Sequence, residues 1–497
     1  MKTIFKFPQM LGAVLLLSCT TDVQPDQQSS VTPAVGVVEP PVTPNNNFTD
    51  ILPPLYPFGN QTSFIKGQVS ATANTANVSS FMTTRMAAPD MGTILKSGEK
   101  INMVAMGGGM TAGVRNGGLY RYGQMTAYPN LVARQMGMTD FQSPLFAENE
   151  ANGTGYLQLV DDGTQYPSWK EVSNSKASVK AGNPPELAKY TGSAVHNYAL
   201  PDGGLREIGT PVNNLGVNVY TNSWSTGRVF SNRLLPKWSG ASEISLLNQV
   251  LKQPTNFFIV EDDVDFLLLM IKNNTQALSS YGYERYSSGP TMVSHILNLM
   301  KENSNANKGV LFTWPIITDL AYFNWYSIQD LKNKAKSISI STTRQNESYT
   351  LDGSSNNFLL LPSPAVDALF RNLKKGGEVS VTLDDKDILD PQEFHINTFF
   401  VRKYNDRIRE LAREKGLAVV DLEKIYGQIH DNTYVSMDGF KVDGSPRGNF
   451  FSADGIYPTV IGQGVIANEV IKAINITYKS TIPLINLRDY SQSVGKE

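Results

Sequence analysis

Cysteine is almost absent from this chain, since Cys19 is the only one among 497 residues. A single cysteine cannot form a disulfide within the chain. Histidine is also scarce: there are four, and no two stand at a spacing typical of zinc ligands. They are His196, His295, His395 and His430. The composition therefore excludes a disulfide-stapled fold and argues against a zinc enzyme, and we expect no metal and no cofactor.

The chain also lacks an excess of either charge. It has 43 Lys and Arg residues against 45 Asp and Glu residues, a formal net charge of -2, and no basic cluster. Because nucleic-acid binding requires a concentration of positive charge, we expect no nucleic-acid partner. Beyond the first twenty residues no apolar run is long enough to cross a bilayer, so the rest of the chain is expected to lie in water.

The first residues have the pattern of a bacterial export signal. Lys2 and Lys6 precede the apolar run 11–17, and the sequence Leu-Leu-Ser-Cys at 16–19 resembles a lipobox. This pattern predicts a signal peptide over 1–18 and a lipidated Cys19 as the new N-terminus. The alternative is an ordinary secretory signal with an incidental cysteine. Several acyl chains on one residue would hold a soluble domain at a membrane without a spanning helix. We expect a lipid anchor in the outer membrane, with the cell surface favoured over the periplasmic face.

Residues 19–60 are rich in Pro, Gln, Asn, Thr and Ser and have no apolar periodicity. Such a composition cannot build a packed core, so this segment is predicted to be a disordered, lipidated tether. Residues 61–497 have ordinary apolar content and are long enough to bury a large core, which predicts one main domain.

Along this domain, short apolar runs alternate with helical patterns, which indicates parallel βαβ construction. A helix is expected over 128–136, with Pro129 in its first turn, and apolar stripes predict further helices near 396–411 and 465–474. The predicted buried strands are 101–106, 256–260, 309–314 and 417–422.

Two stretches interrupt this alternation. Residues 141–210 are polar and rich in loops, and residues 335–385 surround short β patterns such as 337–341. We interpret both as insertions. In α/β proteins, insertions of this size commonly decorate the edge of the sheet where ligands bind.

Four short stretches carry a family resemblance. The first predicted strand leads into Gly-Gly-Gly-Met-Thr-Ala-Gly at 107–113, and the others are Asn-Leu-Gly-Val-Asn-Val-Tyr at 214–220, Asp-Asp-Val-Asp at 262–265 and Asp-Gly-Ile-Tyr-Pro at 454–458. Their order resembles the blocks of the SGNH hydrolases, also called GDSL esterases and lipases, in particular the large lipoprotein members of Bacteroidetes. The resemblance implies a flavodoxin-like three-layer α/β/α sandwich with insertions.

The catalytic residues that give this family its name are replaced by other residues in this sequence. The resemblance places the family's serine on Gly109, its second-block glycine on Val219, its asparagine on Val264 and its histidine on Tyr457. The acid of the last block is kept as Asp454. We expect these five positions to be vestigial.

The chemistry explains why these changes matter. Acyl transfer needs an oxygen nucleophile, a base, and donors aimed at the developing oxyanion. Gly109 has no side-chain oxygen, Tyr457 has a phenol whose ordinary pKa near 10 makes it a poor base at neutral pH, and Val264 cannot donate a hydrogen bond. Loss of nucleophile and base together costs a serine hydrolase about a million-fold in turnover. The sequence therefore predicts a pseudoenzyme.

Three other interpretations of the sequence are alternatives to a pseudoenzyme. Thr111 or Ser452 could replace the missing nucleophile, although each is more typical of a helix start or a loop. Gly107-x-Gly109-x-x-Ala112 fits part of a dinucleotide fingerprint, but the first acid after it is Asp140, too far along the chain for the ribose. The acids of 261–265 could bind Ca²⁺; we favour a solvated loop and helix start, where acids suit the helix dipole.

Two classes of function remain. In the first, the protein is a non-catalytic subunit whose inherited crevice and insertions bind an outer-membrane β-barrel of the FadL type or of the assembly machinery, or another lipoprotein. The resemblance supports this class, because large SGNH-like lipoproteins often accompany such barrels. A role in binding lipid or glycan is a variant of it. In the second class, the protein is an esterase or deacetylase with a non-standard nucleophile that acts on acylated lipid or glycan.

Overall fold

The chain divides into two compact units, Met1–Thr43 and Pro44–Glu497. All residues that the computed structural model describes belong to the second unit. They are 65–71, 76–84, 86–180, 186–192, 194–201, 204–209, 226–235, 245–262, 275–304, 306–344, 347–352 and 358–494. The predicted signal peptide 1–18, the lipidation site Cys19 and the tether 19–60 lie outside the described residues.

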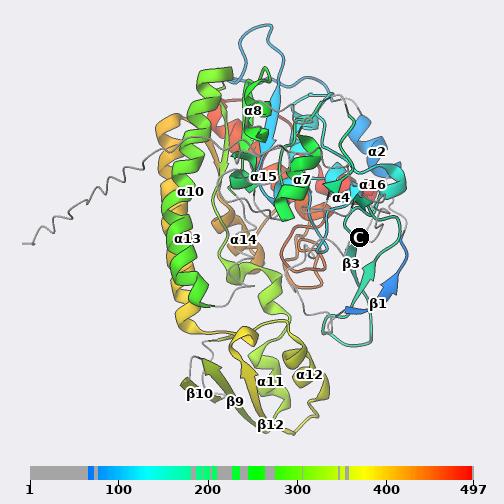
Figure 1. Ribbon diagram of the computed structural model, residues 1–497, viewed down its shortest axis with the longest axis vertical. Helices are drawn as coiled ribbons and strands as arrows, with labels where there is room; N and C mark the ends of the chain where they lie inside the picture. The colour runs from blue at the N-terminus through cyan, green and yellow to red at the C-terminus, as the bar shows by residue number, and fades with distance from the viewer. Residues whose placement is uncertain are drawn as a thin grey trace, which may run out of the picture. The chain divides into compact units, whose positions relative to one another are not determined.

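A four-stranded parallel sheet forms the centre of the described fold (Figure 1). In spatial order its strands are β14 (Ala418–Val420), β8 (Gly309–Phe312), β7 (Phe257–Val260) and β2 (Met103–Met106). Each neighbouring pair runs parallel, and nearly every side chain in the four strands is buried, as in sheets covered on both faces. All four predicted strands are confirmed, and with them the α/β class.

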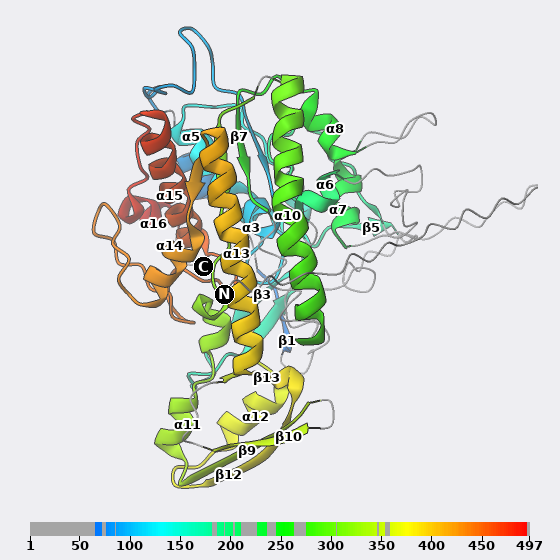
Figure 2. The ribbon, with the colours of Figure 1, turned by 90° about the vertical axis from the view of Figure 1, so that its left-hand side faces the viewer.

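Helices pack on this sheet in two pairs. α5 (Tyr128–Gln135) lies against α15 (Val460–Tyr478), and α10 (Thr275–Ser304) lies against α13 (Pro391–Lys415). Figure 2 shows α5 and α15 on one side of β7 and α10 on the other. The three predicted helices are confirmed as α5, α13 and α15. Helices on both sides of a parallel sheet are the arrangement of an α/β sandwich.

The ends of α13 show how the sequence sets such a helix. Asp390 accepts a hydrogen bond from the Glu393 amide over 2.9 Å, and the Glu393 carboxylate accepts one from the Asp390 amide over 2.8 Å. This capping box satisfies two backbone donors, and Pro391 occupies the first turn, where no donor is needed. Gly416 then ends the helix with a φ of 65°, in the left-handed region that favours glycine.

A fifth segment extends the sheet beyond β2. Residues 196–200 run parallel to β2, with a bridge between Asn197 and Ala105. The Ala105 amide donates to the His196 carbonyl and the Tyr198 amide donates to the Ala105 carbonyl, each over 2.8 Å. The Leu200 amide donates to the Gly107 carbonyl over 2.9 Å. The segment between β2 and β7 in the sequence therefore returns to the outer edge of β2.

The predicted insertion 141–210 contains short strands rather than loops alone. β3 (Tyr156–Leu159) and β4 (Trp169–Val172) pair antiparallel, and β4 also pairs in parallel with β1 (Ile65–Val69), about a hundred residues earlier in the chain. A second pair, β5 (Val179–Lys180) with β6 (Glu186–Leu187), follows.

The predicted insertion 335–385 forms a three-stranded sheet in the order β10 (Glu347–Asp352), β9 (Ser337–Arg344), β12 (Glu378–Asp384), with α11 (Ile328–Lys334) and α12 (Pro364–Asn372) beside it (Figure 1). The β pattern expected at 337–341 is confirmed by β9. This insertion leaves the fold after β8 and returns at the start of α13, so the chain direction attaches it to the carboxyl edge of the central sheet.

The two insertions contact each other. Arg371 of α12 forms an ion pair with Asp162 over 2.6 Å and donates to the Pro167 carbonyl over 2.6 Å. Lys334 donates to the Tyr166 hydroxyl over 2.8 Å. Residues 162–167 of the first insertion are thereby held against α11 and α12.

None of the helices found in the described part of the chain has the length and apolar character needed to cross a bilayer. The remaining α-helices and strands of the described residues are α2 (Ala76–Thr83), α3 (Gly109–Ala112), α4 (Arg121–Met125), α6 (Gly204–Gly209), α7 (Thr226–Leu234), α8 (Leu246–Leu251), α14 (Leu422–His430), α16 (Leu487–Val494), β11 (Leu359–Leu360) and β13 (Ile388–Leu389).

Candidate functional site

The turn after β2 is built from glycines. Gly108 is the N-cap of α3 and Gly109 is its first residue. The helix makes one turn and ends at Gly113, whose φ of 92° lies in the left-handed region. The predicted place of Gly109, directly after the first strand, is confirmed. Gly109 to Ala112 are all buried.

A carboxylate from the neighbouring strand fills the space beside this turn. Glu261 follows β7, and its Oε2 accepts hydrogen bonds from the Gly108 amide over 2.9 Å and from the Thr111 hydroxyl over 2.8 Å. The Thr111 oxygen also lies 2.8 Å from the Tyr128 hydroxyl. Glu261, Thr111 and Tyr128 have no exposed surface. Burial, and then the charge of Glu261, raise the pKa of Tyr128 well above its ordinary value, so the phenol stays protonated.

This arrangement corrects one expectation. Glu261 and Asp262 were predicted to lie in a solvated loop, yet their exposed fractions are 0% and 2%. Asp262 accepts a hydrogen bond from the Tyr404 hydroxyl over 2.8 Å, and its carbonyl accepts one from the Trp314 indole over 2.6 Å. The rings of Tyr404 and Trp314 stack with their centroids 3.7 Å apart. The solvated-loop interpretation is wrong for these two acids, because partners distant in the sequence bury them.

The calcium alternative rests partly on residues that are not described. Asp263, Val264 and Asp265 lie outside the described residues. Within the described part of the chain, no three His, Cys, Asp or Glu side chains come together as a metal site.

Asp454 is fully buried and binds backbone amides. Its Oδ1 accepts hydrogen bonds from Ile456 over 2.8 Å and from Tyr457 over 2.9 Å, and its Oδ2 accepts one from Gly117 over 2.7 Å. Burial raises the pKa of this carboxyl above its ordinary value, and the amide donors oppose that rise. Asp454 therefore fastens two loops, 116–118 and 452–458, to each other.

Tyr426 of α14 joins the Gly109 turn to the Asp454 loop. Its hydroxyl lies 3.7 Å from the Met110 sulfur. Burial raises the pKa of Tyr426, and the charges of Glu261 and Asp454 raise it further. The structure thus brings Gly109, Asp454 and Tyr457 into one buried region. Of the other predicted site positions, Val219 and Val264 lie outside the described residues.

The substitute nucleophiles are both hydrogen-bonded inside the protein. Thr111 donates to Glu261, as described above. Ser452 has an exposed fraction of 3%, and its Oγ accepts a hydrogen bond from the Asn116 amide over 2.8 Å. Each hydroxyl is held by a buried partner, and neither pairs with an imidazole.

All four histidines lie away from these buried hydroxyls. The side chains of His295, His395 and His430 are exposed. His196 accepts a hydrogen bond from the Gln142 amide at Nδ1 over 3.0 Å, and burial lowers its pKa. No described histidine therefore occupies the position of a base beside Thr111 or Ser452.

Sequence reasoning missed Glu261, Tyr128 and Tyr426 as members of this region. Glu261 did carry a signal, because it directly follows a buried strand that neighbours β2. The carboxyl ends of adjacent parallel strands meet at one edge of the sheet. The two tyrosines gave no comparable signal, since each lies on a helical apolar face.

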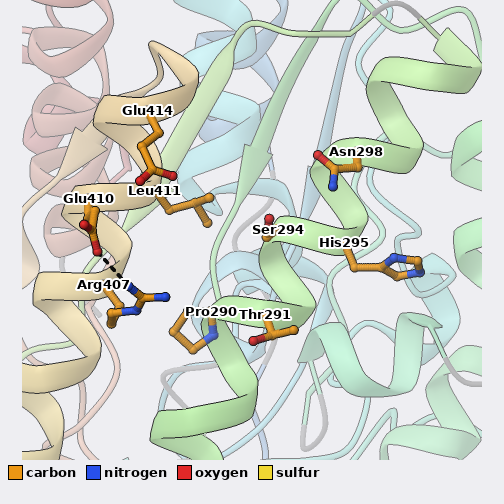
Figure 3. Close-up of a pocket in the computed structure, with 9 residues that line it drawn as sticks. All are labelled: Pro290, Thr291, Ser294, His295, Asn298, Arg407, Glu410, Leu411 and Glu414. Atoms are coloured by element: carbon orange, nitrogen blue, oxygen red, sulfur yellow. Dashed lines mark hydrogen bonds and ion pairs between the residues drawn. The ribbon is translucent and has the colours of Figure 1, made fainter.

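A groove of about 350 Å³ lies between α10 and α13 (Figure 3). Arg407 and Glu410 of α13 form an ion pair across 2.7 Å, while the His295 ring points away from α13. The charges of the groove are thus partly neutralised within one helix. Its lining residues are Pro290, Thr291, Ser294, His295, Asn298, Arg407, Glu410, Leu411 and Glu414.

No protein-family model, no curated protein and no solved structure matches this chain.

Proposed function

We propose that this protein is a non-catalytic, SGNH-hydrolase-like outer-membrane lipoprotein that serves as an accessory subunit of a β-barrel complex. The proposal rests on the lack of an accessible nucleophile among the described residues around Gly109. The turn offers no nucleophile, and the nearby hydroxyl of Thr111 is fully buried and bonded to Glu261. Because the described residues around Gly109 provide no accessible nucleophile and no neighbouring imidazole, acyl transfer would lack its first step there.

The strand order supports the finer proposal that the fold is flavodoxin-like. With the segment 196–200 counted as the second strand, the order across the sheet becomes second, first, third, fourth, fifth. That is the flavodoxin-like order, in which ligands bind where the strand order reverses, between the first and third strands. Here those strands are β2 and β7, and Glu261 fills the space beside the turn that follows β2. A crevice filled by the protein's own side chains fits a binding or scaffolding role better than turnover.

The proposed membrane anchor rests on the lipobox-like sequence ending at Cys19, and the proposed partner rests on the family resemblance. The two insertions, joined through Arg371 and Asp162, supply surface beyond the central fold for such a partner. Extraction of the native complex in mild detergent, followed by affinity isolation, is expected to recover a stoichiometric β-barrel protein. Cys19→Ala is the control and should leave the membrane fraction. Recovery of the wild-type protein alone would remove the subunit proposal.

One observation favours the second candidate, an esterase with an unusual nucleophile. The Thr111 hydroxyl lies 2.8 Å from the Glu261 carboxylate, which is hydrogen-bond distance for a nucleophile and its base. Full burial of both groups opposes this role, because a substrate would have to displace packed side chains to reach them.

Hydrolysis of short-chain aryl esters separates the two candidates. We expect the purified protein to hydrolyse them no faster than buffer, and Thr111→Val to leave that rate unchanged. Thr433→Val, which changes an exposed threonine, is the matched control. Turnover well above the buffer rate that disappears in Thr111→Val and persists in Thr433→Val would establish the esterase instead.

A further inference from the structure

A second cavity lies apart from the Gly109 region. It has a volume of about 330 Å³ and is lined by Arg121 at the start of α4, residues 142, 143 and 145–147, Glu150, Ala177, residues 187–192 and Arg233 near the end of α7. None of the residues described above around Gly109 and Asp454 lines it. Its volume is at the lower end of the range typical of small-molecule sites. We name it the Arg233 cavity.

Two arginines of this cavity are held by backbone carbonyls. Arg233 is 8% exposed, and its two terminal nitrogens donate to the carbonyls of Pro144 and Leu145 over 2.6 and 2.7 Å. Arg121 donates to the Phe146 carbonyl over 2.5 Å. These carbonyls fix the guanidinium groups but do not neutralise them, since a carbonyl carries no net charge. The Nε of Arg121 is buried and has no acceptor among the described residues.

Lys189 brings a third positive charge to the same cavity. Its ammonium group donates to the carbonyls of Asn232 and Leu235 over 2.5 and 3.2 Å. A lysine ammonium has three donors, so these two bonds leave one for a ligand. Lys189 is thus positioned by neutral groups, and Glu186, whose charge acts on it, is exposed and does not line the cavity.

Aromatic rings fix the orientation of Arg233. Its guanidinium carbon lies 4.7 Å from the centre of the Phe146 ring and 5.6 Å from the centre of the Tyr190 ring. Contacts of this kind stabilise a cation while leaving its charge in place. Burial lowers the pKa of Arg233 to about 10, so the group remains protonated at neutral pH.

The charges that line the cavity do not balance. Arg121, Lys189 and Arg233 face a single lining carboxylate, Glu150, which accepts a hydrogen bond from the Ser178 amide over 2.9 Å. Glu148 lies 3.7 Å from Arg121, but 88% of its side chain is exposed. Among the described residues that line the cavity, three cations and one acid leave two positive charges in excess, and the nearby Glu148 and Glu186 are both exposed. Like charges gathered in a partly desolvated cavity repel one another, and a bound anion removes that cost.

We propose that the Arg233 cavity binds a soluble organic oxyanion, a molecule of about the size of a monosaccharide that carries a phosphate or carboxylate group. The guanidinium groups suit both, because their fixed donors match the geometry of either anion. The site is independent of the non-catalytic role proposed above and would also be compatible with an active enzyme.

Calorimetric titration tests the proposal with glucose 6-phosphate, glucuronate, glucose and inorganic phosphate as probes. We expect one or both sugar anions to bind and to raise the melting temperature of the protein. The sugar phosphate and the sugar acid distinguish a phosphate site from a carboxylate site. Glucose should not bind, because it carries no charge, and inorganic phosphate should bind more weakly than the preferred sugar anion.

Substitutions then locate the site. Arg121→Gln and Lys189→Gln should each weaken binding about tenfold or more, since each removes a charged hydrogen-bond donor. Arg407→Gln is the matched control, because it removes one positive charge from the groove between α10 and α13, and it should leave affinity unchanged. Lys189 is exposed, so its substitution is expected to leave the fold intact. Failure of both sugar anions to bind, binding of glucose with equal affinity, or unchanged affinity in Lys189→Gln would overturn the proposal.

Discussion

Substitution of Gly107 tests whether the region around the first turn is packed or open. A β-carbon at this position would lie 2.6 Å from the Glu261 Oε2, 2.6 Å from the Thr111 Oγ1 and 2.9 Å from the Thr111 Cβ. The first two atoms belong to the buried hydrogen bond between Thr111 and Glu261. Gly107→Ala must therefore displace the buried side chain of Thr111, the carboxylate of Glu261, or both.

The size of the effect follows from these contacts. Overpacking of a filled interior costs about 1–3 kcal/mol, and loss of one hydrogen bond to a charged group adds about 1.5–3 kcal/mol. We expect Gly107→Ala to lower the free energy of unfolding by about 3 kcal/mol or more. If the region were an open crevice, Thr111 and Glu261 could move aside into water, and the cost would be small.

Urea unfolding followed by circular dichroism measures this difference. Gly209→Ala is the matched control, because a β-carbon on Gly209 would meet no atom of the described residues within 4 Å; it should be neutral or slightly stabilising. A loss below about 1 kcal/mol in Gly107→Ala, with the control unchanged, would refute the packed description and reopen the region to a substrate.

Two further predictions concern the charged side chains of Asp319 and Arg371. Burial raises the pKa of Asp319 from 3.8 to about 6, so its contribution to stability is present below pH 4 and is lost as the pH rises through 6. The full pKa shift corresponds to about 3 kcal/mol of stability, and partial exposure of the side chain reduces this amount. Asp319→Asn should make the free energy of unfolding depend less on pH between pH 4 and 7, and the control Asp140→Asn should not. Equal pH dependence in the wild-type protein and Asp319→Asn would contradict this role of Asp319. Arg371→Lys should speed proteolysis within 161–168, because lysine cannot reproduce the bonds of Arg371 to Asp162 and to the Pro167 carbonyl. The control Arg407→Lys should leave the rate of proteolysis unchanged. An unchanged rate in Arg371→Lys would show that Arg371 does not hold this segment in place.

The central sheet could be predicted because its information is local. Each of the four strands is a short apolar run. Such a run, flanked by polar residues, can be predicted as a buried strand without knowing which strands pair with it. The same holds for α5, where Pro129 marks the first turn, and for α13, where apolar residues between 396 and 411 recur at helical spacing. Signals of this kind lie within a few residues of the element that they specify.

The pairing of distant segments could not be predicted in this way. β1 pairs with β4 across about a hundred residues of chain, and residues 196–200, within the first insertion, return to β2. The acids after β7 were misjudged for the same reason. Acids after a strand are usually solvated, but Glu261 meets the Gly108 amide and Asp262 meets the Tyr404 hydroxyl. Only the folded chain shows those partners.

Asp454 has a structural role in the fold that does not depend on any reaction. Its two oxygens accept hydrogen bonds from three buried backbone amides, those of Gly117, Ile456 and Tyr457. An unpaired buried donor costs about 1–3 kcal/mol, so loss of the carboxylate would destabilise the fold even in a protein with no catalysis to protect. Under the proposed family resemblance, selection for folding alone would be enough to keep an acid here after an imidazole had gone. A serine or histidine whose side chain faces a substrate has no such second role, so the proposed loss of catalysis would leave Asp454 in place together with Gly109 and Tyr457.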